Sequence, residues 1–249
     1  MRRILAAVDD STAAHPVIAL AEGIASLFDA TTDALHVADA EGPTVQAVAD
    51  ARGVPLRTLN GDTLVRLAIE CASDDVVAVV CGTGSPPAGA ARGEVAVALA
   101  GTLDKPVVVV PPDAPITDDV RRVLMAIKGT PTKPRALKRA VELTAASGLE
   151  LLVVHVDDLN SIPSFSDQVQ YETELYAQQF LARYVIGAPQ ARLTLRIGDP
   201  ADEILATADE LRADVIAVGW PHTTEPLHGQ VARQIIQRSR IPVLLVATT

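Results

Sequence analysis

The residues best suited to chemistry follow two short apolar runs of the sequence. Asp9 and Asp10 come directly after the run 4–8, and the loop 82–94, with four glycines and an arginine, comes after the run 76–81. Paired carboxylates can hold a divalent cation, and glycine-rich backbone ahead of a helix can bind an anion through its N–H groups. The pattern therefore predicts a small-ligand site. The alternatives are that the acids cap the first helix and that the loop is an ordinary surface loop.

No familiar arrangement for covalent or metal-assisted catalysis accompanies these residues. The loop lacks the Gly-Lys-Ser/Thr ending of a P-loop, and no glycine triplet of the dinucleotide-binding type follows the first apolar run. Ser11 and Ser85 lie outside any Gly-x-Ser-x-Gly turn, which the nucleophile of an α/β-hydrolase requires. His36 and His155 have no partner at metal-binding spacing, so we expect both to be structural. The sequence thus predicts no catalytic residue and no metal site.

The elements that must position the candidate residues occur twice along the chain. Landmarks recur 119 residues later in the first part of the repeat and 136 or 137 residues later in the rest. The change in spacing marks an insertion of 18 residues in the second copy, between His155 and Gly198. Because separated landmarks keep their register, we infer a tandem duplication. The matching pairs are 4–8 with 123–127, 35–37 with 154–156, 61–62 with 198–199, Gly82 with Gly219, and 106–110 with 242–246.

A proline-rich stretch at 111–119 separates the two copies. Proline cannot donate to a sheet ladder, so this stretch predicts a linker between domains at 1–113 and 119–249. Within each copy, aliphatic runs typical of strands buried on both faces alternate with helical patterns. This alternation predicts an α/β fold with a parallel sheet, whose ligands bind beyond the carboxyl ends of the strands. The expected helix caps are Asp62 and either Ser11 or Thr12.

The bounds of the expected elements follow from these patterns. Strands are expected at 3–8, 33–38, 76–81, 107–110, 122–127, 150–156, 191–197, 214–219 and 243–246. Helices are expected at 14–28, 44–52, 62–73, 94–103, 134–147, 166–186, 200–212 and 230–238. The inserted residues of the second copy fall in the long helix at 166–186, whose counterpart in the first copy is the short helix at 44–52.

These landmarks resemble the universal stress protein family. The resemblance rests on Val8-Asp9-Asp10-Ser11, on Leu35-His36-Val37, on the Gly-Asp pair before the third helix, and on a glycine loop followed by Pro-Val-Val-Val-Val. It implies two tandem, doubly wound modules related by a pseudo-two-fold axis, each with five parallel strands in the order 3-2-1-4-5. It also implies antiparallel pairing of the last strands of the two modules. Such an internal pseudo-dimer would cover two aliphatic edges that are otherwise prone to aggregation.

Some members of that family hold an adenine nucleotide, with an acid after the first strand and the phosphates on a Gly-x2-Gly-x9-Gly-Ser/Thr loop. Asp9 matches the acid, but its counterpart in the second copy is Lys128, and both loops are shorter than the family pattern. Glu94 stands where the pattern has Ser or Thr. A carboxylate beside a phosphate costs about 1 kcal/mol in water and several in a partly buried site. We therefore expect degenerate nucleotide sites, with ATP or AMP in the first module as the alternative.

The match assigns fourteen residues to the two candidate sites. In the first copy they are Ala7, Asp9, Val37, Gly82, Gly84, Ser85, Gly93, Glu94 and Val95. In the second copy they are Lys128, Val156, Gly219, Gly229 and Gln230.

Composition and charge limit the remaining possibilities. The 249 residues carry a net charge of −10, which disfavours generic nucleic-acid binding. No apolar stretch is long enough for a signal peptide or a membrane span, and two cysteines are too few for a disulfide scaffold. Nine of the ten negative units fall in residues 1–118. The second copy has a basic cluster that comprises Lys128, Lys133, Arg135, Lys138 and Arg139. This cluster is a solvated face, or it binds an anionic ligand or faces the acidic first copy.

Together these features predict a cytoplasmic, non-enzymatic stress-response protein that binds an unknown protein or small-molecule partner, but neither nucleic acid nor membrane. Two alternatives stay open at this point. One is an adenine-nucleotide-binding protein that uses the first module, with slow ATP hydrolysis at most. The other is a structural scaffold in which both sites are vestigial.

Overall fold

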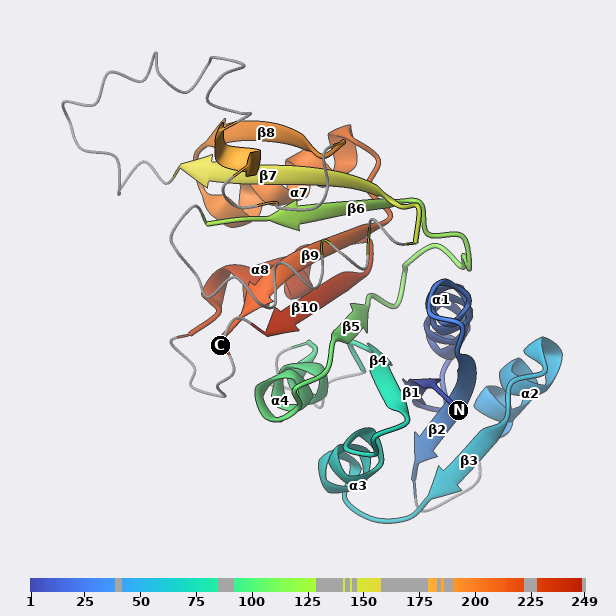
Figure 1. Cartoon of the computed structure of the whole chain (residues 1–249). Helices are drawn as coiled ribbons and strands as arrows, with labels where there is room; N and C mark the ends of the chain where they lie inside the picture. The colour runs from blue at the N-terminus through green and yellow to red at the C-terminus, as the bar shows by residue number, and fades with distance from the viewer. Residues whose placement is uncertain are drawn as a thin grey trace.

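The computed structural model describes residues 1–38, 42–84, 92–128, 141, 144, 147–157, 179–182, 185, 190–221 and 228–247 (Figure 1). The elements of the first half are β1 (Arg3–Val8), α1 (Ala14–Leu27), β2 (Thr31–Val37), α2 (Pro43–Arg52), β3 (Leu56–Leu59), α3 (Thr63–Cys71), β4 (Val76–Gly82), α4 (Glu94–Thr102) and β5 (Val107–Val110). Those of the second half are β6 (Arg122–Ala126), β7 (Glu150–Asp157), β8 (Arg192–Ile197), α7 (Pro200–Glu210), β9 (Val215–Trp220), α8 (Gln230–Arg238) and β10 (Val243–Ala247).

The described strands form one ten-stranded sheet in the order β3-β2-β1-β4-β5-β10-β9-β6-β7-β8. Every neighbouring pair is parallel except β5 and β10, which run antiparallel with Val109 opposite Val243 and Val107 opposite Leu245. In Figure 1 the two halves of the chain lie on either side of this one antiparallel contact. The predicted α/β fold with a mostly parallel sheet is confirmed.

Aliphatic strand sequences supply both faces of the sheet, because successive side chains of a strand point to opposite sides. In β1, Ile4 and Ala6 belong to one buried cluster, which α1 and α2 cover. Leu5 and Ala7 belong to the other, which α3, α4, α7 and α8 cover. Both clusters continue across the junction between β5 and β10. The antiparallel contact is therefore part of a continuous core.

Both cysteines lie in this core. Cys71 and Cys81 are free thiols, and burial raises the pKa of each to about 12. They are therefore protonated at neutral pH.

The N-cap of α3 is the one predicted from the sequence, whereas the N-cap of α1 is not. The Asp62 carboxylate accepts the N–H of Val65 at 2.9 Å and caps α3, as predicted. In α1 the N-cap is Ala13, not Ser11 or Thr12. The Ser11 hydroxyl instead accepts the N–H of Ala13 at 3.2 Å, in a turn that precedes the helix.

For one described strand, the fifth that the family resemblance implies in the first module, no residue range was expected. β3 is a four-residue edge strand in which no side chain is fully buried. Its neighbour β2 pairs with it from Ala34–Leu56 to Val37–Leu59. Such a short edge strand has no continuous aliphatic run, so the criterion that found the buried strands did not find it.

Several expectations lie wholly or mostly outside the described residues. They are the helix at 134–147, most of the helix at 166–186, and the basic residues Lys133, Arg135, Lys138 and Arg139. Within the described part of the chain, no helix is both long and apolar enough to cross a membrane.

Candidate functional site

The first candidate site lies at the carboxyl ends of β1, β2 and β4, which are neighbours in the sheet. Val8 lies opposite His36, and Ala7 lies opposite Cys81. Ala7 and Val37 both contact the cluster on the face covered by α3 and α4. The predicted residues of β1 and β2 are thus brought together at one edge and on one face, as a doubly wound sheet requires.

The loop from β4 to α4 is closed by hydrogen bonds at both ends. The N–H of Thr83 donates to Val110 at 3.0 Å, and the N–H of Gly93 donates to Thr83 at 2.9 Å. Gly93 is the N-cap of α4 with φ +78°, and a Cβ there would lie 2.8 Å from Ile236 Cγ2. Glycine is therefore required at position 93 for both conformation and space. Gly84 also has a positive φ, of +69°, whereas Ser85 lies outside the described residues.

Thr83 places a polar group inside this loop that sequence reasoning missed. The residue is 7% exposed, and its hydroxyl has no hydrogen-bond partner in the structure as described. A buried polar group left in this way costs about 1–3 kcal/mol. The hydroxyl, located between Gly82 and Gly84, is thus able to donate or accept a hydrogen bond at the carboxyl edge.

The two acids after β1 have different roles. The Asp9 carboxylate accepts the Ser11 hydroxyl at 2.5 Å. The Asp10 carboxylate accepts the backbone N–H of Val45, in the first turn of α2, at 2.9 Å. The expectation that this pair caps the first helix is wrong, because no side chain caps α1, and Asp10 caps α2 instead. Only Asp9 remains available as the acid of a ligand site.

His36 explains why the cap of α2 comes from elsewhere in the chain. Its Nδ1 lies 3.0 Å from the carbonyl oxygen of Val8, and the residue is 4% exposed. Gly42, the N-cap of α2, packs so closely that a Cβ there would lie 2.7 Å from Val45 Cγ1 and 3.0 Å from His36 Nε2. No capping side chain fits at position 42. His36 is thus buried and in contact with the neighbouring strand, as the structural interpretation expects.

Glu94 and Val95 begin α4 and are exposed. A carboxylate in the first turn is favoured by the positive end of the helix dipole. The N–H groups and the dipole of a helix N-terminus are also what a bound phosphate would use. Glu94 therefore places a negative charge at the position where an anionic ligand would need to approach.

The second candidate site repeats the framework of the first with different chemistry. His155 Nδ1 lies 2.8 Å from the carbonyl oxygen of Ile127, as His36 does with Val8, and Val156 contacts the same apolar face as Val37. Lys128 is exposed in the place of Asp9. His155 is thus buried and in contact with the neighbouring strand in the same way as His36.

Trp220 occupies the volume beneath the start of α8. Its ring is 1% exposed, and a Cβ at Gly229 would lie 2.6 Å from it. The guanidinium of Arg233 lies 5.1 Å from the ring centroid, within cation–π range. Thr83 is the residue at this position in the first half. The second half thus has an indole where the first has a small hydroxyl side chain, beside the predicted Gly219 and Gln230.

Trp220 was expected only as part of the loop after the strand at 214–219, and its packing role was not predicted. The available signal was a lone tryptophan directly after a strand glycine. In the part of the chain that the structure describes, no group of three or more His, Cys, Asp and Glu side chains is placed to hold a metal ion.

A mostly parallel sheet, strand-to-helix loops at its carboxyl edges and glycine-started helices beside them define a doubly wound α/β protein. The model of the universal stress protein family matches residues 119–247, just over half of the chain. The chain belongs to the universal stress protein family.

Individual relatives agree with this assignment. Universal stress protein G of Shigella flexneri is 31% identical over 84 residues, which cover 33% of this chain and 59% of that protein. A universal stress protein of Archaeoglobus fulgidus has a TM-score of 0.67 at 18% identity and covers 99% of this chain and 98% of its own. A protein of unknown function from Pseudomonas aeruginosa has a TM-score of 0.70 at 16% identity and covers 100% and 93%. At such identities these structures establish a similar fold.

Proposed function

We propose that this chain is a non-enzymatic stress-response protein of the universal stress type whose nucleotide sites have degenerated. It consists of two tandem modules, residues 1–113 and 119–249, and acts in the cytoplasm by binding a protein or small-molecule partner. The five-strand order on each side of the junction and the matching His36 and His155 contacts support the duplication. Antiparallel pairing of β5 with β10 supports an internal pseudo-dimer.

The position of Trp220 is the observation that carries this proposal. Its buried ring lies directly under Gly229, at the helix start on which the phosphates of a nucleotide would bind. The exposed Lys128 also removes the acid that would contact the rest of the nucleotide. The second module therefore lacks the acid of the family pattern and has a bulky indole packed against the start of α8.

The first module is closed to triphosphates for a different reason. Glu94 presents a carboxylate at the start of α4, and the preceding loop is short. Because Glu94 is exposed, the repulsion between this charge and a phosphate a few ångströms away amounts to about 1 kcal/mol for each pair of unit charges.

A specific observation favours one alternative, which is adenine-nucleotide binding in the first module. The unpartnered Thr83 hydroxyl lies in the β4–α4 loop, and Asp9 remains half-buried at the end of β1. A ligand that hydrogen-bonds both groups would relieve the cost of leaving the hydroxyl unsatisfied. A nucleoside or monophosphate would meet less repulsion from Glu94 than a triphosphate would.

Isothermal titration calorimetry with ATP, ADP and AMP distinguishes degenerate sites from adenine-nucleotide binding in the first module. Degenerate sites predict no saturable heat that depends on Asp9. Nucleotide binding in the first module predicts saturable heat with at least one of the three, abolished by Asp9→Lys, which copies the second module. Asp10→Asn is a matched control, because Asp10 is occupied with the α2 cap and its amide oxygen can still accept that bond. Heat lost in Asp9→Lys and kept in Asp10→Asn would overturn the proposal.

A further inference from the structure

The second half has a cavity at the opposite edge of the sheet, where strands begin rather than end. Its volume is about 300 Å³, and its lining includes Arg122, Leu152, Arg192, Leu211 and Arg212. These residues come from the starts of β6, β7 and β8 and from the end of α7. The cavity is therefore separate from both candidate nucleotide sites, which lie at the carboxyl edges.

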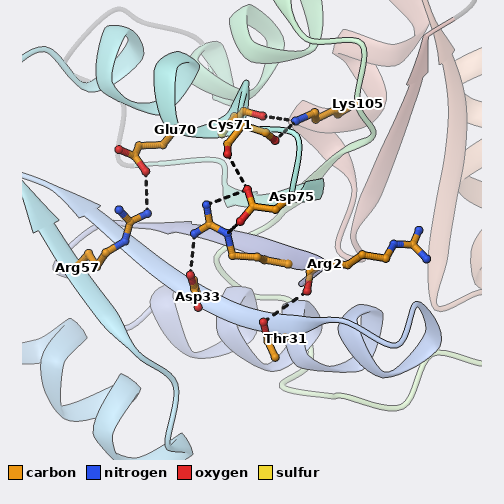
Figure 2. A network of polar contacts seen from close by, with 10 residues as sticks. Arg2, Thr31, Asp33, Arg57, Glu70, Cys71, Asp75 and Lys105 are labelled. Carbon is orange, nitrogen blue, oxygen red and sulfur yellow. Dashed lines mark hydrogen bonds and ion pairs between the residues drawn. The ribbon is translucent and has the colours of Figure 1, made fainter.

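The same place in the first half is filled by carboxylates. Arg3 begins β1, and its guanidinium lies 2.7 Å from an oxygen of Asp33 and 2.7 Å from an oxygen of Asp75. Figure 2 shows Asp33 and Asp75 pointing toward one guanidinium from two sides. The Arg3 side chain is only 18% exposed. Two acids thus neutralise one arginine at the amino edge of the first half.

In the second half the arginine is kept and both acids are absent. Arg122 begins β6 as Arg3 begins β1, and Leu152 lies opposite Leu124 as Asp33 lies opposite Leu5. Arg212 follows Asp75 by the 137 residues that separate later landmarks of the repeat. A leucine and an arginine have therefore replaced the two carboxylates, and both line the cavity.

The acids that line the cavity are engaged with other groups. Glu150 lies 3.2 Å from Arg122, and Glu210 pairs with Arg196, which is not among the lining residues. Arg192 and Arg212 are exposed and have no ion pair within the described residues. The cavity therefore presents two uncompensated guanidinium groups in addition to the partly satisfied Arg122.

The positive surface extends into a second cavity of about 280 Å³ that shares Arg122 and Arg212. Its acids are also engaged. Asp214 accepts the backbone N–H groups of Arg121 and Arg122, both at 2.8 Å, and Asp119 pairs with Arg121. Arg212 has no ion pair within the described residues, although the Asp214 carboxylate lines the same cavity and keeps its charge.

We propose that the cavity at Arg122, Arg192 and Arg212 binds a small dianion, which supplies the negative charge that Asp33 and Asp75 supply in the first half. Guanidinium groups bind carboxylate and phosphate oxygens through paired, charge-assisted hydrogen bonds. A cavity of this volume is at the lower end of the range for small-molecule sites. Leu152 and Leu211 add an apolar wall, which suits a ligand with a short hydrocarbon part.

Calorimetric titration of the full chain with succinate and, separately, with inorganic phosphate tests this proposal. Saturable binding of either anion is expected, and the tighter of the two identifies the preferred oxyanion. Arg212→Asp restores the acid of the first half at this place and is expected to weaken binding about tenfold or more, the loss that one charge-assisted bond implies. Arg192→Ala, which changes an exposed side chain, is expected to weaken it similarly.

Arg240→Asp is the matched control, because Arg240 is exposed and lies outside both cavities but its substitution changes the net charge equally. The affinity of Arg240→Asp for the anion is expected to stay within about twofold of that of the parent chain at physiological salt, where distant charges are screened. Far-UV circular dichroism checks that each variant is folded. Absence of binding to both anions, unchanged affinity in Arg212→Asp and Arg192→Ala, or an equal loss in Arg240→Asp would each overturn the proposal.

Discussion

The carboxylate of Asp10 caps α2 by accepting the backbone N–H of Val45, 35 residues further along the chain. The N-cap position itself is Gly42, where a Cβ would collide with Val45 and approach the His36 ring. The acid after the first strand thus supplies a helix cap that the local sequence cannot. This contact connects the end of β1 to the start of α2, and it leaves Asp9 as the only acid of the pair at the candidate ligand site.

Asp10→Ala is expected to lower the free energy of unfolding by about 1 kcal/mol, the usual cost of removing a capping acceptor. Asp10→Asn keeps an acceptor oxygen and should lose less. Urea unfolding followed by circular dichroism measures both. Equal stability of Asp10→Ala and the parent chain would show that the cap contributes nothing.

The pH dependence of stability should contain a contribution from Asp75. Its hydrogen bond to Arg3, with a smaller one to Ser73, lowers the pKa of its carboxyl from 3.8 to about 2. Because the folded pKa is lowered, ionised Asp75 stabilises the fold above about pH 4, and this stabilisation is lost as the pH falls toward 2.

Between pH 5 and pH 2, the melting temperature of Asp75→Asn should therefore fall less steeply than that of the parent chain. The variant lacks the Asp75 carboxyl, whose pKa is lowered from 3.8 to about 2 in the folded chain. Asp74→Asn is the neighbouring control, since Asp74 has no ion pair among the described residues. Parallel curves for Asp75→Asn and the parent chain would contradict the Arg3 contact.

Gly23 allows the connection between the two halves to pass directly over α1. A Cβ at this position would lie 2.2 Å from the carbonyl oxygen of Asp118. Gly23→Ala is expected to destabilise the chain by about 1 kcal/mol or more, since overpacking against backbone outweighs the gain in helix propensity. Thermal unfolding measures the change. A more stable variant would mean that the linker moves away without cost.

A fragment of residues 1–112 should associate with itself or precipitate. It would expose the edge of β5, whose four valines are all buried in the full chain and three of which pair with β10. An unpaired aliphatic edge is a template for pairing with another chain. Sedimentation velocity gives the result. A stable monomer would show that the two halves do not depend on each other.

The buried strands of both halves were predictable because continuous aliphatic runs are typical of strands buried on both faces of a sheet. β3 was not, since the half-exposed side chains of Leu56–Leu59 give an edge strand no such run. The caps of α3 and α7 follow from local sequence, in which Asp62 and Asp199 directly precede each helix. The cap of α2 does not follow from local sequence, because the pairing of β1 with β2 is what brings Asp10 close to the start of that helix.

The candidate site was likewise predictable from the sequence only in part. Asp9, the glycine starts of α4 and α8 and the change to Lys128 were legible from the repeat. The filling of the second site by Trp220 was not, because it depends on packing between the ring and Gly229. The arginine cavity was missed for a related reason. The second half has no acids equivalent to Asp33 and Asp75, and their absence becomes notable only once the structure shows that both acids pair with Arg3.

The most direct test of the degenerate carboxyl-edge sites is a titration of the ¹⁵N-labelled chain with ATP, followed by the backbone amide signals of Gly84, Gly93, Gly219 and Gly229. We expect these four signals to stay in place at millimolar ATP, even if amides near Arg122 and Arg212 respond to the phosphates. Saturable shifts of Gly84 and Gly93 that disappear in Asp9→Lys would show that the first site binds the nucleotide. Saturable shifts of the Gly219 and Gly229 amide signals would show that Trp220 does not close the second candidate site.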